Sequence, residues 1–181
     1  MQGDYAKHAQ VVEKLGVRAV EVRTSSQLRV IDALIIPGGE STTILKLIDK
    51  FDMRENLISF AESHPLMGTC AGLIVMSSEV SKLEEKPLGL LDVAVERNAY
   101  GRQRESFIDM VQLSLNGKVH EITGVFIRAP KISRIGNDVS VLATYKQEAV
   151  LVAANNILAA TFHPELTFEE DIHRYFIEKF C

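Results

Sequence analysis

Cys70 lies between two glycines in the segment Gly68-Thr69-Cys70-Ala71-Gly72, where a short apolar stretch gives way to a helical pattern. A Gly-x-Cys-x-Gly turn between a strand and a helix is typical of an exposed nucleophile, because the glycines permit the cramped backbone. The start of the following helix can favour a thiolate and stabilise an oxyanion. Taken alone, the segment fits a small buried cysteine equally well.

A second segment, Thr161-Phe162-His163-Pro164-Glu165, offers a general base. A neutral imidazole at His163 can take a proton from a thiol and later return it to a leaving amine. The carboxylate of Glu165 can orient that imidazole and stabilise its charged form. The alternative, a surface loop before a helix, is favoured for the segment by itself, but the cysteine turn reverses the balance.

Two adjacent glycines, Gly38 and Gly39, follow the apolar run 33–36 in the segment 37–43, Pro-Gly-Gly-Glu-Ser-Thr-Thr. Backbone N–H groups gather at such a turn, which makes it a candidate oxyanion hole or anion cradle. Ser41 or Thr42 is expected to cap the helix that follows. The alternative is an ordinary turn between a strand and a helix.

Arginines end two strand-like segments, at Glu96-Arg97 and at Arg128. A guanidinium in such a position can bind a substrate carboxylate through two parallel hydrogen bonds. Ordinary ion pairs with neighbouring acids are the alternative.

The elements that must position these residues alternate in the first half of the chain. Helices are expected up to Gly16, through 45–48, over 52–63 and from 71, and strands over 17–22, 33–36 and just before Cys70. Such alternation predicts parallel strands with helices on both faces, and ligands bind beyond the carboxyl ends of such strands. The second half is expected to add antiparallel strands within 88–97, 106–115, 124–130, 139–144, 149–154 and 157–162. A final helix, 167–180, is expected to place Phe168 toward the core.

The composition excludes several classes of protein. The chain has 181 residues, enough for one domain over 1–181, and a formal net charge of −4 without a basic block, which argues against nucleic-acid binding. Its apolar runs are too short to span a bilayer, so a cytoplasmic protein is expected. Two cysteines, Cys70 and Cys181, form no disulfide framework. The spacing of the remaining histidines in the sequence does not match that of metal ligands, so no metal site is expected. These histidines are His8, His64, His120 and His173.

Five stretches together resemble the glutaminase subunits of pyridoxal phosphate synthases, which belong to the class I, triad-type glutamine amidotransferases. They are Pro-Gly-Gly-Glu-Ser-Thr-Thr at 37–43, Gly-Thr-Cys-Ala-Gly at 68–72, Val-Glu-Arg-Asn-Ala-Tyr-Gly-Arg-Gln at 95–103, Phe-Ile-Arg-Ala-Pro at 126–130 and Phe-His-Pro-Glu-Leu-Thr at 162–167. The resemblance covers essentially the whole chain. It implies an α/β fold, a flavodoxin-like three-layer sandwich with a mostly parallel central sheet.

The resemblance also implies roles for individual residues. The catalytic triad would be Cys70, His163 and Glu165. The oxyanion hole would be formed by Gly38, Gly39 and Ala71, and glutamine would be bound by Gly39, Glu40, Ser41, Arg97, Ile127 and Arg128.

By the same resemblance, the chain would hydrolyse L-glutamine to glutamate and ammonia through a thioester, without a cofactor or metal. The ammonia would pass to a synthase subunit that makes pyridoxal phosphate from a pentose phosphate and a triose phosphate, with glutaminase subunits docked around a dodecameric synthase core. Two alternatives are a non-catalytic docking subunit that senses glutamine and a related cysteine hydrolase with another substrate.

The family usually begins with an apolar strand ahead of the Gln-Gly-Asp found here at 2–4. The sheet is therefore expected to lack its first strand and to expose apolar edges, which would make a catalytically weak or inactive docking subunit an alternative.

Overall fold

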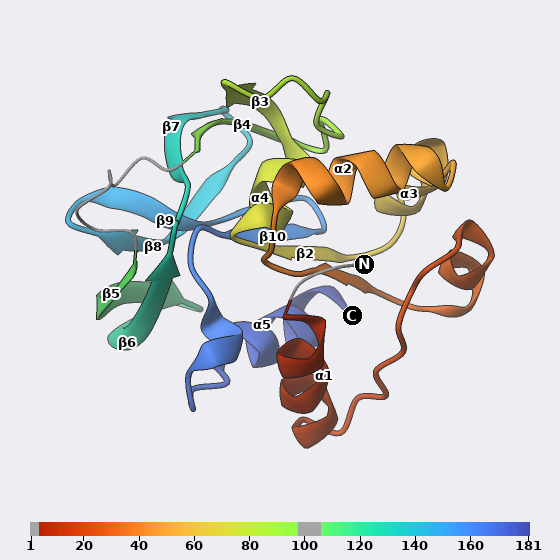
Figure 1. Cartoon of the computed structure of the whole chain (residues 1–181). Helices are drawn as coiled ribbons and strands as arrows, with labels where there is room; N and C mark the ends of the chain where they lie inside the picture. Colours follow the sequence, from red (N-terminus) through yellow and green to blue (C-terminus); the bar gives the residue numbers. More distant parts are fainter. Residues whose placement is uncertain (1–3, 98–105) are drawn as a thin grey trace.

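Short buried strands alternate with helices in the first half of the chain in the computed structural model, which describes residues 4–97 and 106–181 (Figure 1). In chain order the elements are α1 (Tyr5–Lys14), the 3₁₀ helix η1 (Ser25–Val30), β1 (Leu34–Ile36), α2 (Ser41–Lys50), α3 (Arg54–Ala61), β2 (Leu66–Thr69) and α4 (Ala71–Met76). This order agrees with the expected helix–strand alternation, and most of the stretch 95–103 that carries part of the resemblance lies outside the described residues.

The second half is dominated by strands. They are β3 (Ser77–Ser81), β4 (Leu91–Glu96), β5 (Ser106–Leu115), β6 (Lys118–Ile127), β7 (Lys131–Ile135), β8 (Ser140–Tyr145), β9 (Glu148–Ala154) and β10 (Ile157–Ala160), followed by the 3₁₀ helix η3 (Pro164–Leu166) and α5 (Asp171–Phe180). Asn116 and Gly117, both with positive φ, form the tight turn between β5 and β6. The expected run of strands in this half is therefore found in outline, although β7 was not expected.

The main sheet has seven strands in the order β1-β2-β10-β9-β8-β5-β6. β2 is parallel to both β1 and β10, with Leu66 opposite Leu34 and Ile157, whereas the pairs from β10 to β6 are antiparallel. A smaller sheet has the order β3-β4-β7. The α/β class with a parallel region and added antiparallel strands is confirmed.

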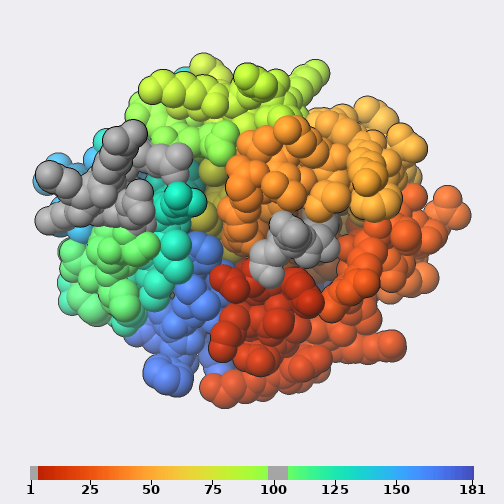
Figure 2. All heavy atoms as spheres, in the orientation of Figure 1, coloured from red at the N-terminus to blue at the C-terminus, as the bar shows by residue number. Residues whose placement is uncertain are grey.

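Alternate residues of the main sheet point into two hydrophobic cores. Leu66 and Ile157 belong to the core under α2, α3 and α4, whereas Met67 and Leu158 belong to the core that includes Phe176 of α5. Because both faces of β2 and β10 are covered, these strands are apolar at nearly every position. Figure 1 shows α2 and α3 on one side of the sheet and α1 and α5 on the other, and Figure 2 shows α1 and α2 together on one face of the molecule.

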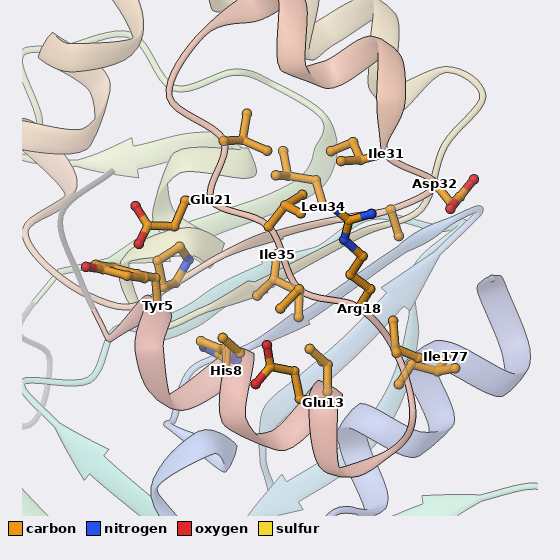
Figure 3. Close-up of a pocket in the computed structure, with 18 of the residues that line it drawn as sticks. Tyr5, His8, Glu13, Arg18, Glu21, Ile31, Asp32, Leu34, Ile35 and Ile177 are labelled. Atoms are coloured by element: carbon orange, nitrogen blue, oxygen red, sulfur yellow. The ribbon is translucent and has the colours of Figure 1, made fainter.

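A cavity of about 1130 Å³ adjoins β1 at the edge of the main sheet. Figure 3 shows it between α1, which carries His8 and Glu13, and β1, which carries Leu34 and Ile35. Among the described strands β1 pairs only with β2, so its other edge carries unpaired backbone groups. An exposed sheet edge was expected, and β1 provides one among the described strands.

The segment 17–22, which was expected to be a strand, is irregular backbone. Val17, Val20 and Val22 line the cavity across from β1. Alternating apolar residues favour an extended chain, but a strand also needs a hydrogen-bonded neighbour, and the cavity lies where that neighbour would be. The prediction of a strand over 17–22 was therefore wrong because the tertiary structure offers this segment no neighbouring strand.

Three smaller expectations also differ from the structure. Glu40 caps α2, because its carboxylate accepts hydrogen bonds from the N–H groups of Thr42 and Thr43, so neither Ser41 nor Thr42 is the cap. Phe168 is fully exposed because α5 begins only at Asp171. Strand β3, directly after α4, was not expected. In the described part of the chain, no helix is long and apolar enough to cross a membrane.

Candidate active site

Cys70 occupies a sharp turn between β2 and α4. Its backbone has φ 49° and ψ −102°, a conformation that L residues rarely adopt, and its N–H donates to the carbonyl of Ala160 at 2.9 Å. A Cβ atom at Gly72 would lie 2.0 Å from the carbonyl oxygen of Ile36, so only glycine fits where α4 crosses β1. The strained turn and the close approach explain the glycines around Cys70 and support its interpretation as a nucleophile.

His163 and Glu165 lie just beyond the end of β10. Nδ1 of His163 is 2.8 Å from Oε1 of Glu165, and the two residues are 4% and 3% exposed. The N–H of His163 donates to the carbonyl of Val125 at 2.9 Å, which fixes the backbone beside β6. Because β2 and β10 are adjacent and parallel, their carboxyl ends bring Cys70 and His163 to the same place.

The charges of this cluster are coupled. Burial alone would lower the pKa of His163, but its hydrogen bonds to Cys70 and Glu165, together with their charges, raise that pKa to about 10. Burial would raise the pKa of Glu165, whereas hydrogen bonds from His163 and His8 lower it to about 2. At neutral pH the site therefore holds a protonated imidazole beside a carboxylate, with the cysteine as its third partner.

The glycine turn after β1 runs against the imidazole. A Cβ atom at Gly38 would lie 2.3 Å from Cε1 of His163, and Gly39 has φ 148°, which favours glycine. Sγ of Cys70 lies 3.7 Å from the carbonyl oxygen of Ile127. The backbone of the expected oxyanion turn thus adjoins His163, and Ile127 adjoins the thiol of Cys70.

The remaining expected glutamine-binding residues form a second group. Nη2 of Arg97 is 3.1 Å from Oε1 of Glu40, and Nη1 is 3.4 Å from Oγ1 of Thr42. Ser41, at the start of α2, is 2% exposed. Arg128 follows β6 with φ 47° and is exposed. Arg97 is thus joined to the glycine turn by its ion pair with Glu40. An ion pair with a neighbouring acid was the alternative that the sequence left open for this arginine.

Comparison with known proteins identifies the family. The model of the SNO glutamine amidotransferase family matches residues 1–181. The chain belongs to this family. The chain is 46% identical to the pyridoxal 5'-phosphate synthase subunit PdxT of Thermotoga petrophila over 179 residues, covering 98% of this chain and 95% of the relative.

Further similarities support membership of the SNO family. The PdxT protein of Francisella tularensis subsp. novicida is 48% identical over 177 residues, which cover 98% of this chain and 94% of that protein. A crystal structure described as a glutamine amidotransferase superposes with a TM-score of 0.92 at 43% identity, covering 98% of this chain and 94% of the other.

Three residues around the triad of this SNO amidotransferase were not expected from the sequence. His8 of α1 contacts Glu165 and Thr69, and His173 of α5 contacts His8. Asp4 places a carboxylate oxygen within 4.8 Å of ligand atoms of His163 and Glu165. No local spacing could have signalled these contacts, because they depend on how α1 and α5 pack beneath the sheet.

Proposed function

We propose that this SNO amidotransferase is the glutaminase subunit of a pyridoxal 5'-phosphate synthase, acting as a single domain over 1–181. It hydrolyses L-glutamine to L-glutamate and ammonia and passes the ammonia to a synthase subunit. The observation that supports this most strongly is the meeting of Cys70 with the His163–Glu165 pair at the carboxyl ends of β2 and β10. The names of the relatives from Thermotoga and Francisella support the pathway.

In the first half of the reaction, the thiolate of Cys70 attacks the side-chain amide carbon of glutamine. A carbon–sulfur bond forms, and the carbonyl oxygen becomes an oxyanion that accepts hydrogen bonds from backbone N–H groups of Gly39 and Ala71. Protonated His163 then gives its proton to the amide nitrogen, the carbon–nitrogen bond breaks, and ammonia leaves. The product on the protein is a glutamyl thioester at Cys70.

In the second half, water hydrolyses the thioester. Neutral His163 takes a proton from the water as its oxygen attacks the thioester carbon, and the same backbone N–H groups bind the new oxyanion. The carbon–sulfur bond then breaks, which releases glutamate and returns Cys70 as a thiolate beside a protonated imidazole. Glu165 holds Nδ1 of His163 throughout and stabilises its positive form.

Recognition of glutamine would depend on the groups beside the glycine turn. The carboxylate of Glu40 suits the α-ammonium of the substrate, and the guanidinium of Arg97 suits its α-carboxylate. Arg97 is only 25% exposed and already contacts Glu40, so both groups are held in place before the substrate arrives. Ser41, Ile127 and Arg128 would complete the site, as the family resemblance implies.

The partner would be a synthase subunit with a dodecameric core around which glutaminase subunits dock. Ammonia released into water would be protonated and diluted, so direct transfer between the subunits would preserve the nucleophilic form. This requirement accounts for a glutaminase that works only as part of a complex.

Replacement of Cys70 tests the proposal. In a mixture with the synthase subunit, a pentose phosphate and a triose phosphate, Cys70→Ala should abolish pyridoxal phosphate formation from glutamine and retain formation from added ammonium. Cys181→Ser, the matched control at the exposed C-terminus, should behave as the unmodified protein. Glutamine-dependent formation by Cys70→Ala would contradict the proposal.

A glutamine analogue with an electrophilic ketone separates the alternatives. Covalent labelling of Cys70, prevented by excess glutamine, is expected of a glutaminase. A non-catalytic sensor would bind glutamine without being labelled, and a hydrolase with another substrate would not be protected by glutamine.

A further inference from the structure

Two buried histidines behind the triad have no part in the reaction just described. His8 projects from α1 beside the cavity at the edge of β1 and is 3% exposed (Figure 3), and His173 of α5 is 0% exposed. Buried imidazoles are costly unless their nitrogens are satisfied, so the partners of these two rings indicate what they do.

His8 contacts the Glu165 side of the site and also the residue next to Cys70. Its Nε2 lies 3.4 Å from Oε1 of Glu165 and 3.1 Å from Oγ1 of Thr69, the residue directly before Cys70. Oε1 is also the oxygen that faces Nδ1 of His163 at 2.8 Å. Two imidazoles thus converge on one carboxylate oxygen, while Oε2 of Glu165 is buried without a hydrogen-bond partner among the residues described.

The positions of the ring hydrogens on His8 and His173 follow from the groups that can accept a hydrogen bond from them. The carboxylate of Glu165 can only accept and the hydroxyl of Thr69 can accept as well, so an arrangement with the hydrogen of His8 on Nε2 satisfies both neighbours. Nδ1 of His8 lies 2.9 Å from Nε2 of His173. Nδ1 of His173 is buried and finds no acceptor within the described ranges, so the hydrogen of His173 is on Nε2 and is donated to His8. The result is a chain of hydrogen bonds in which His173 donates to His8 and His8 donates to Glu165.

The charge state of His173 agrees with this direction. Burial, and then the neighbouring His8, lower the pKa of His173 to about 3, although Glu165 and Glu170 act in the opposite sense. His173 is therefore neutral under physiological conditions and presents one hydrogen and one bare nitrogen. A single tautomer of His8 is selected, because only one of its nitrogens can donate while the other accepts.

We propose that His8 is a positioning residue of the triad, whose Nε2–H holds Oε1 of Glu165 against His163 and ties Thr69 beside Cys70, and that His173 fixes the required tautomer of His8. This inference rests on the proposed glutaminase function. Without His8, Glu165 is free to turn its second oxygen toward His163, and the imidazole loses its fixed orientation. Since His8 touches none of the residues assigned to glutamine, its loss should reduce turnover and leave glutamine binding unchanged.

The kinetic test compares His8→Leu with His8→Gln in the complex with the synthase subunit. His8→Leu should lower kcat about 10- to 100-fold, as is usual for removing a group that orients a catalytic imidazole, with KM for glutamine within about twofold. His8→Gln places an amide N–H near the position of Nε2 and should restore most of kcat. Rates are expressed per site labelled by the glutamine-analogue electrophile, so that unfolded protein does not count.

An unchanged kcat per labelled site in His8→Leu, or a His8→Gln variant as slow as His8→Leu, would overturn the proposal. An equal increase of KM in both variants would also overturn it, because His8 would then act on substrate binding.

A spectroscopic test does not depend on activity. The ¹⁵N chemical shifts of histidine-labelled full-length chain should show a hydrogen on Nε2 of both His8 and His173, and His173→Leu should change the shifts of both ring nitrogens of His8. A Nδ1–H tautomer of His8 in the unmodified chain would refute the positioning chain. If the unmodified complex lacked glutaminase activity while these shifts were as expected, the proposed function would fail and the hydrogen-bond chain would stand.

Discussion

A Cβ atom at Gly38 would lie only 2.3 Å from Cε1 of His163, so the backbone after β1 is in direct contact with the His163 imidazole. Gly38 and His163 follow strands that are separated by β2 in the main sheet. The glycine turn therefore limits where the imidazole can lie, besides the oxyanion-binding role proposed for its backbone N–H groups.

Gly38→Ala should lower kcat by about 100-fold or more, because the added methyl group must displace the imidazole and misplacement by about 1 Å is enough for such a loss. Steady-state glutaminase kinetics in the complex measure this effect. Gly89→Ala is the control: Gly89 has φ 71°, and a Cβ atom added there would meet nothing within 4 Å, so the change should strain only the backbone and leave kcat per labelled site unaltered. A fully active Gly38→Ala variant would show that the turn does not constrain His163.

Arg97→Lys should raise KM for glutamine about 10-fold and change kcat much less, because lysine cannot keep the contacts of Arg97 with Glu40 and Thr42 and also bind the substrate carboxylate through two hydrogen bonds. Glutamine titrations of the complex provide the measurement. Arg134→Lys, which alters an exposed ion pair of 2.9 Å with Asp92, should change neither constant. Equal behaviour of the two variants would remove Arg97 from the glutamine site.

Acid should destabilise the fold through His173. Its pKa is about 3 in the folded chain and about 6.5 when unfolded, so between these values the unfolded state binds one more proton and stability falls as the pH decreases. His8, Glu165 and Glu170 are the titratable neighbours that contribute to this pKa. Urea unfolding measures the free energy of unfolding at pH 7.0 and at pH 5.0. Between these pH values that free energy should fall less in His173→Gln than in the unmodified protein, and the difference should amount to about 1.4 kcal/mol for each pH unit below 6.5. Parallel pH dependence of the two proteins would contradict this assignment.

An apolar β-forming segment of about six residues joined ahead of Met1 should raise Tm, because it can pair with the free edge of β1 and fill part of the adjoining cavity. A gain of about 2 kcal/mol would correspond to roughly 4–8 °C for a chain of this size. A Gly/Ser segment of equal length is the control and should have little effect. Equal Tm values for the two extended chains would mean that the cavity does not accept a strand.

The turn at Cys70 and the pairing of His163 with Glu165 could be predicted because their signals are local, whereas their catalytic roles stay a prediction. The flanking glycines of Cys70 and the proline beside His163 report backbone constraints that act within a few residues, and the structure shows the strained φ of 49° at Cys70. The assignment of glutamine as substrate came from family resemblance, because nothing in the spacing of these residues specifies which amide is attacked.

Features that depend on contacts between distant parts of the sequence could not be predicted from local patterns. His8 and His173 showed no spacing that suggested a role, since their contact with Glu165 depends on the packing of α1 and α5. Phe168 fitted a helical pattern by periodicity, but the helix begins three residues later. The segment 17–22 has the alternation of a strand and lacks the neighbour that would make it one.

The pairing of β2 with β10 has a consequence for synthesis of the chain. Leu66 is opposite Ile157, and the N–H of Cys70 is bonded to the carbonyl of Ala160, so the turn around the thiol is completed by a strand far along the sequence. Closing so long a loop is slow compared with forming the local helices. During translation the thiol emerges well before His163, so under the proposed function a nascent or prematurely terminated chain would carry the cysteine without its base and would not release ammonia.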